Sequence, residues 1–256
     1  MAADELKTKP ELSPFSLRVG VYDMSLTTEV RVDTPAGSFG TRIGFEDDLN
    51  LEKNAEAVNV AFRWRFKQRH FVEAEYFRIN REGNRRIETE IRFGDDVFPI
   101  GANIRSAFTT EVTRLGYSYR IVRSRNWGLA VGAGVHVTRL RANLVEVQID
   151  GGPSIGETEI ARVTAPLPVF GIGGAARLSE KWALLGRAQY FTLEYDDIDG
   201  SIYHSAIYLE HDTFKNFGFG IGYDRFRVDV KTEEKYWRGR ARVEFEGPMI
   251  FLKGSF

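Results

Sequence analysis

Residues 238–256 read RGRARVEFEGPMIFLKGSF and place apolar side chains at alternate positions up to a final aromatic residue. Counting back from the end, one face carries Phe256, Gly254, Leu252, Ile250 and Pro248. Across the Gly247-Pro248 break the alternating apolar set moves to Phe245, Val243 and Ala241. Because successive side chains of a strand point to opposite faces of a sheet, this period of two predicts a long terminal β-strand.

The same alternation recurs along the rest of the chain, and no helical period competes with it. The nine further segments are 15–21, 58–66, 72–76, 115–121, 129–137, 170–178, 184–190, 207–209 and 217–223. With the terminal strand this makes about ten strands. We therefore predict an all-β protein, an antiparallel up-and-down transmembrane β-barrel.

The connections between these strands alternate in length. Short polar turns are expected at 67–70, 123–126, 179–181 and 215–216. Long connections rich in Gly, Asp and Glu are expected at 32–55, 80–103, 150–164, 196–201 and 231–237. Short turns at one end and long loops at the other are typical of outer-membrane barrels. Residues 25–45 and 87–104 are expected to extend as hairpins, so eight or twelve strands are alternatives.

Composition excludes several classes of protein. The mean hydropathy is −0.30 and no run of 18 apolar residues occurs, which excludes a helical membrane protein. Aromatic residues make up 13% of the chain, which suits girdles at the two edges of a bilayer. There is no Cys, hence no disulfide or thiol chemistry, and the net charge of −1 gives no nucleic-acid footprint.

The face opposite the apolar set is polar and is expected to line the lumen. It carries Arg18, Arg63, Arg65, Glu73, Glu75, Arg114, Ser118, Arg120, Arg187, Gln189, Tyr208 and Glu210. A symmetric hairpin around Arg69 would place Arg65 opposite Glu73 and Arg63 opposite Glu75, as structural charge pairs. Glycines on the same face would let long side chains fold across a narrow lumen, so we expect a mostly plugged interior in preference to a water-filled path.

The chain resembles the small proteobacterial outer-membrane β-barrels, of the OmpA transmembrane-domain, OmpX and OmpW types. The resemblance rests on hairpin rhythm, girdles, a charged lumen and the terminal Phe256, which in that class is an assembly signal. It implies a periplasmic N-terminal segment at 1–14, a barrel at 15–256, and periplasmic turns opposite extracellular loops. It also implies an outer-membrane location, with a signal peptide already removed, and contacts with outer-membrane lipid, lipopolysaccharide and the barrel-assembly machinery. A monomer is expected, although the sequence leaves the oligomeric state open.

Candidate chemistry is sparse. Of the four histidines, His70 and His211 lie near short turns, His136 points inward, and His204 is expected at an extracellular rim beside Asp199. His204 and Ser205 are adjacent and so point to opposite faces, which argues against a catalytic pair. Residues 196–201 (DDIDGS) resemble the front of a calcium loop but lack its downstream Glu, so a turn is favoured. We expect no catalytic residue, metal or cofactor.

Acidic residues gather in the predicted outer loops, at 46–48, 95–96, Glu157 and Glu159. The leading functional prediction is a non-enzymatic envelope or surface role for a plugged barrel with acidic loops. A narrow pore for ions or small solutes is the alternative, and an outer-membrane lipid-modifying enzyme or protease is a second alternative. The sequence does not identify a ligand or a transported solute.

Overall fold

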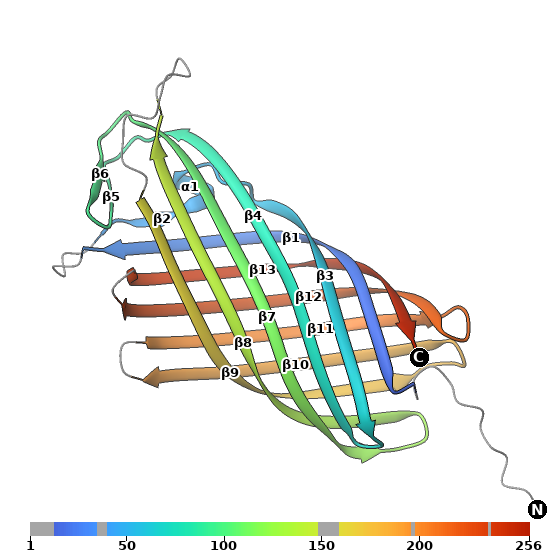
Figure 1. The fold of residues 1–256 in the computed structure, drawn as a ribbon. Helices are drawn as coiled ribbons and strands as arrows, with labels where there is room; N and C mark the ends of the chain where they lie inside the picture. Colours follow the sequence, from blue (N-terminus) through green and yellow to red (C-terminus); the bar gives the residue numbers. More distant parts are fainter. Residues whose placement is uncertain (1–12, 35–39, 148–158, 196–197, 235–236) are drawn as a thin grey trace, which may run out of the picture.

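The computed structural model describes residues 13–34, 40–147, 159–195, 198–234 and 237–256, and shows a closed antiparallel β-barrel (Figure 1). Its ten long strands are β1 (Phe15–Asp33), β3 (Asn54–Lys67), β4 (His70–Arg86), β7 (Asn103–Arg123), β8 (Trp127–Glu146), β9 (Glu159–Arg177), β10 (Trp182–Tyr195), β11 (Ile198–Asp212), β12 (Phe217–Glu234) and β13 (Trp237–Ser255). Each pairs with its neighbours, and β13 pairs with β1 to close the barrel. The predicted fold class and the count of ten strands are confirmed.

Four short elements lie at the end of the barrel away from the short turns. They are β2 (Arg42–Gly44), α1 (Phe45–Asp48), β5 (Ile91–Phe93) and β6 (Asp96–Phe98). β2 pairs with β1, and β5 pairs with β6, so both predicted hairpin extensions contain β structure. Within the described residues, no helix is long and apolar enough to cross a membrane.

The strands are longer than the sequence predicted. The ten of them contain 14 to 21 residues, whereas a strand needs roughly 9–11 residues to cross a bilayer. Two predicted long loops are therefore wrong: β10 reaches Tyr195 and β11 begins at Ile198, while β12 reaches Glu234 and β13 begins at Trp237. The barrel thus has one half near the short turns, the short-turn half, and a second half beyond it, the far half.

The two halves have opposite inside and outside chemistry, as β1 shows. Leu17, Val19 and Val21 point outward and are exposed, whereas Met24 and Leu26 point inward and are buried. Backbone alternation continues unbroken, so the change lies in the sequence, whose apolar residues switch from odd to even positions. The predicted loops were wrong for this reason, since apolar residues in the opposite phase still belong to a strand.

The same reversal falls at the Gly247-Pro248 break of β13. Ile250 is 65% exposed on the outside, whereas Phe245 is buried inside. The ladder between β1 and β13 is interrupted at this point, between the Tyr22–Met249 and Ser25–Glu246 pairs. Pro248 has no N–H to donate, and a Cβ on Gly247 would collide with the carbonyl oxygen of Asp23. The break therefore marks the boundary between the two halves on this strand.

The interior of the far half is packed with apolar side chains, which we call the inner core. Its members include Met24, Leu26, Val30, Phe45, Leu49, Ile79, Phe108, Leu140, Val228 and Val243. The segment containing α1 supplies part of it, and the Phe45 and Phe108 rings meet edge to face with centroids 5.3 Å apart. The predicted polar lumen residues all lie nearer the short turns, whereas this half, which was predicted to consist of loops, is filled with apolar side chains as a soluble barrel is.

Candidate functional site

The outside of the short-turn half carries a continuous band of exposed apolar residues, which we call the apolar belt. It includes Leu17, Val19, Val21, Val58, Val60, Phe62, Leu115, Leu129, Val131, Phe170, Ile172, Ile207, Phe219, Ile221, Ile250 and Leu252. Exposed aromatics border it at both edges: Trp64, Phe66, Trp127, Trp182, Phe214 and Phe217 near the short turns, and Tyr76, Tyr190, Tyr203 and Tyr223 towards the far half. This is the composition of a lipid-facing barrel surface.

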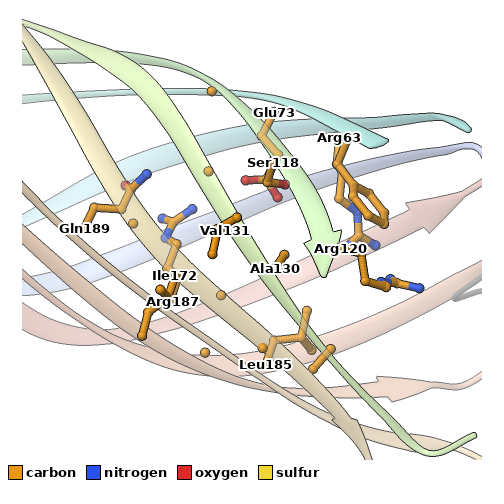
Figure 2. Close-up of a pocket in the computed structure, with 18 of the residues that line it drawn as sticks. Arg63, Glu73, Ser118, Arg120, Ala130, Val131, Ile172, Leu185, Arg187 and Gln189 are labelled. Atoms are coloured by element: carbon orange, nitrogen blue, oxygen red, sulfur yellow. The ribbon is translucent and has the colours of Figure 1, made fainter. Parts of the chain in front are cut away.

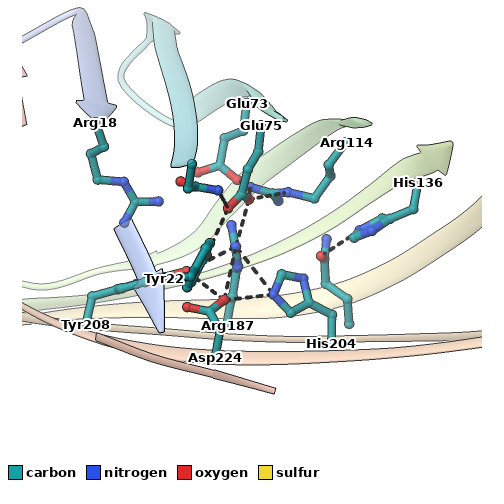
Figure 3. A network of polar contacts seen from close by, with 12 residues as sticks. Arg18, Tyr22, Glu73, Glu75, Arg114, His136, Arg187, His204, Tyr208 and Asp224 are labelled. Atoms are coloured by element: carbon teal, nitrogen blue, oxygen red, sulfur yellow. Dashed lines mark hydrogen bonds and ion pairs between the residues drawn. The ribbon is translucent and has the colours of Figure 1, made fainter. Parts of the chain in front are cut away.

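A network of buried polar side chains fills the lumen between the two halves, and Glu75 is its centre (Figure 3). The Glu75 carboxylate accepts hydrogen bonds from Arg114 at 2.9 Å, from Arg187 at 2.8 Å and from Asn59 at 2.9 Å. Arg114 also lies 3.5 Å from Glu73. One carboxylate thus joins strands β3, β4, β7 and β10 across the barrel.

A second carboxylate, Asp224 of β12, completes the network on the opposite wall. It lies 3.0 Å from the His204 ring and accepts a hydrogen bond from the Tyr208 hydroxyl, also at 3.0 Å. Arg187 stands between the two acids, because its Nη2 atom is 3.8 Å from Asp224 as well as 2.8 Å from Glu75. Buried charges need such partners, since an unpaired one loses its hydration without compensation.

The predicted register of the β3–β4 hairpin is wrong. Arg63 lies opposite Glu73 and Arg65 lies opposite Phe71, so neither predicted pair faces its partner. The register shifts between Arg65 and Lys67, where an irregularity leaves Phe66 without a paired residue in the backbone ladder to β4. Such a bulge displaces the ladder from the symmetric pairing that turn length alone suggests.

The remaining predicted lumen residues lie on the inner face at different heights. Arg18 is 3.9 Å from Glu210, whose other oxygen accepts a hydrogen bond from Lys253 at 2.8 Å. Arg120 stacks over the Phe71 ring at 4.8 Å. Gln189 lies 3.2 Å from His136. The structure brings Glu75, Arg114 and Arg187 together, whereas Arg63 forms no hydrogen bond with the members of that network.

Sequence reasoning missed several members of the network. It did not include Asn59, Asp224 or Tyr22, whose hydroxyl lies 3.5 Å from Glu75, and it placed His204 at the rim. It also missed Lys253, the partner of Glu210. His204 is only 5% exposed, lies inside the barrel and faces Asp224. Asp224 follows the outward-facing Tyr223, so the alternation of β12 contained the signal that it points inward.

The other histidines are packed among aromatic rings. His136 is buried and its ring lies 5.7 Å from that of His204. His70 lies 2.7 Å from the Tyr117 hydroxyl, and His211 packs on Trp182 at 4.6 Å. Within the described part of the chain, no group of three or more His, Asp or Glu side chains is placed to bind a metal. Asp196 and Asp197 of the calcium-like segment lie outside the described residues.

Below the network, towards the short turns, the lumen contains a pocket with a cavity volume of about 160 Å³ (Figure 2). Arginine and glutamate side chains line part of it, with Arg63 and Arg120 at one end and Arg187 with Gln189 at the other. Between them, β8 and β9 contribute small residues, among them Ala130, Gly132 and Gly173, together with the larger Leu129, Val131 and Ile172. The pocket lining therefore combines charged side chains with apolar and small residues.

In the far half, beyond the apolar belt, charged groups pair in two settings. Glu46, which was predicted to make an outer loop acidic, is buried inside and forms an ion pair with Arg81 at 2.5 Å. The pKa of Arg81 is lowered by burial, against the opposing effect of Glu46.

On the outside, Asp229 accepts hydrogen bonds from Arg240 and Arg242. Burial acts to raise the pKa of Asp229, but these two arginines lower it below its ordinary value.

A closed ten-stranded antiparallel barrel with an aromatic-edged apolar belt is the architecture of bacterial outer-membrane β-barrels, and this chain has that fold. The outer membrane protease OmpT from Escherichia coli superimposes with a TM-score of 0.60 and 14% identity, over 99% of this chain and 100% of that chain. Ail, the attachment invasion locus protein of Yersinia pestis, gives a TM-score of 0.40 at 12% identity, covering 94% and 97% of the two chains. The Pseudomonas putida toluene transporter TodX gives 0.38 at 10% identity, covering 96% and 91%.

No protein-family description and no curated protein matches the sequence. At 14% identity, the likeness to OmpT establishes the fold and not the activity.

Proposed function

We propose that the protein is an integral outer-membrane barrel with a closed lumen and a non-enzymatic role at the cell surface or in the envelope. The observation that carries the proposal is the contrast between its two halves. The apolar belt suits contact with lipid, whereas the far half is apolar inside and charged outside, as a water-exposed barrel would be. On this proposal the short turns face the periplasm and the far half projects outside the cell.

Two successive barriers support a closed lumen. The first is the network around Glu75 and Asp224, which joins opposite walls of the barrel by hydrogen bonds. The second is the inner core, whose members Val30, Phe108 and Val243 are at most 1% exposed. An ion crossing this interior would have to displace close-packed apolar side chains, which argues against the pore alternative.

The surroundings of His204 support a non-enzymatic role. His204 and Asp224 are 5% and 2% exposed, and the Phe226 ring lies 5.8 Å from the His204 ring. A general base must come within hydrogen-bond reach of its substrate, directly or through one water. The neighbouring Ser205 points to the other face of β11, so it does not form a nucleophile–base pair with His204.

The outer face of the far half offers contacts for lipopolysaccharide. Arg141 of β8 lies directly opposite Arg162 of β9, and both are exposed. Neither forms an ion pair with any residue that the structure describes, whereas nearby Arg139 pairs with Glu111 at 2.6 Å. Like charges in adjacent positions destabilise a sheet unless an anion lies between them. Lipopolysaccharide phosphates beyond the belt would supply that anion. This proposed contact uses Arg141 and Arg162 and not the acidic residues predicted in the outer loops.

Conductance and hydrolysis measurements test the proposal together. Reconstituted into planar bilayers, the purified protein should show no stable conductance steps under conditions in which a porin control conducts. Incubated with casein or with phospholipid vesicles, it should release no more product than a His204→Ala variant. Stable conductance steps from the wild-type protein would contradict the closed lumen and favour the pore alternative. Hydrolysis that His204→Ala abolishes would contradict the non-enzymatic role and favour the enzyme alternative.

A further inference from the structure

We propose that the pocket in the short-turn half binds a small organic anion, with a planar body about the size of one aromatic ring and one carboxylate or phosphate group. The proposal concerns a pocket below the two barriers and so does not depend on whether the lumen conducts. Only the compartment that supplies the ligand, the periplasm, rests on the proposed function.

The charges around the pocket are unbalanced. Its lining includes five arginines, Arg18, Arg63, Arg114, Arg120 and Arg187, but only two acids, Glu73 and Glu210. Three of these arginines already have acidic partners within 4 Å, and Arg120 stacks on Phe71. The lining therefore holds more positive charge than its own acids neutralise.

Arg63 is the arginine that remains available. It lines the pocket and is attracted by the charges of Glu73 and Glu210, yet it forms no hydrogen bond, and no ion pair within 4 Å, with the residues that the structure describes. Its guanidinium offers five donors in a planar fork that matches a carboxylate or phosphate. The Ser118 hydroxyl also lines this part of the pocket and can donate a further hydrogen bond to the same anion.

Glycines of the pocket lining leave room for a flat body. A Cβ added to Gly173 would meet nothing nearer than the Gly186 carbonyl oxygen at 3.5 Å, and one added to Gly116 nothing nearer than the Ala133 carbonyl oxygen at 3.8 Å. A Cβ at either position would make only ordinary van der Waals contact, so a larger side chain could be accommodated there and would occupy the pocket. The volume of about 160 Å³ suits one ring, because an apolar cavity of roughly 150 Å³ is known to bind benzene.

The experiment uses the full chain refolded in detergent micelles, with benzoate, inorganic phosphate and benzylamine as probes in calorimetric titrations. Benzoate should bind saturably at one site, phosphate should bind more weakly, and benzylamine should not bind. The Arg63→Ala variant should lose about tenfold or more in benzoate affinity, since a hydrogen bond to a charged group contributes that much. Arg125→Ala is the matched control, because Arg125 is exposed in a short turn at the same end and outside the pocket.

A second variant tests the pocket without touching any charge. Gly173→Leu should place its side chain in the pocket and abolish benzoate binding while Arg63 remains. Circular dichroism and the heat-dependent gel shift of folded barrels will show whether each variant is folded. Absence of benzoate binding by the folded wild-type protein would overturn the proposal. So would binding that survives both Arg63→Ala and Gly173→Leu, because that result would place the anion elsewhere. Conductance of the wild-type barrel would instead affect only the proposed function.

Discussion

Neutralising Glu75 should destabilise the barrel far more than neutralising Glu73, two residues away on the same strand. Both acids contact Arg114, so each substitution by Gln removes one negative charge from the same partner. Their settings differ: the Glu75 side chain is 3% exposed and binds two arginines within 2.9 Å, whereas that of Glu73 is 32% exposed and lies 3.5 Å from one. This pair of variants therefore compares a buried carboxylate that has two close arginines with a partly exposed carboxylate that has one.

The expected magnitudes follow from these settings. Removing one partner of a buried ion pair costs about 3–5 kcal/mol, because the remaining charge stays buried without its nearest partner. After Glu75→Gln, Arg187 keeps only the more distant Asp224, at 3.8 Å. A partly exposed pair contributes only about 0–1 kcal/mol. Glu75→Gln should therefore lose at least about 2 kcal/mol more unfolding free energy than Glu73→Gln.

Urea unfolding in lipid vesicles, followed by tryptophan fluorescence, would measure both losses. The double variant Glu75→Gln/Arg187→Gln should be less destabilised than the sum of its single changes, because it removes the stranded charge as well. The reasoning would be refuted if Glu75→Gln were no more destabilising than Glu73→Gln. It would then follow that water hydrates Arg187 inside the folded barrel.

The remaining predictions concern the outside of the barrel. Val19→Arg, in the apolar belt, should cost about 2–4 kcal/mol in vesicle refolding, whereas Thr27→Arg, farther along the same face of β1, should cost almost nothing; equal losses would contradict the division into halves. Because Arg240 helps to hold the pKa of Asp229 below its ordinary value of 3.8, their contact stabilises the fold above that pH and is lost as the pH falls through the lowered pKa. Asp229→Asn should therefore show a smaller loss of stability on acidification than the wild-type protein, and parallel pH profiles would exclude the contact. Phe256→Ala should reduce assembly in cells but leave refolding in detergent largely intact, and normal surface levels of the variant would contradict the assembly-signal prediction.

The sequence by itself determined the architecture, because period-two alternation is a local property of each strand. The ten segments, from 15–21 to 238–256, all became strands, and the four short turns separate the strands they were predicted to join. The belt also followed directly, since Val19 or Ile250 can only lie outside if the alternate positions lie inside. The sequence also shows that the apolar positions change phase at Gly247-Pro248. It does not show that this change marks the boundary between the two halves of the barrel.

Only the tertiary structure decided what meets across the lumen. Glu75 and Arg187 are 112 residues apart, and their contact depends on barrel closure and on the heights of both strands. One irregularity at Phe66 was enough to move Arg63 opposite Glu73, which no count along a symmetric hairpin predicts. The inner core likewise required the far half to be closed around the segment of α1, because the inside of a barrel exists only once its strands have paired.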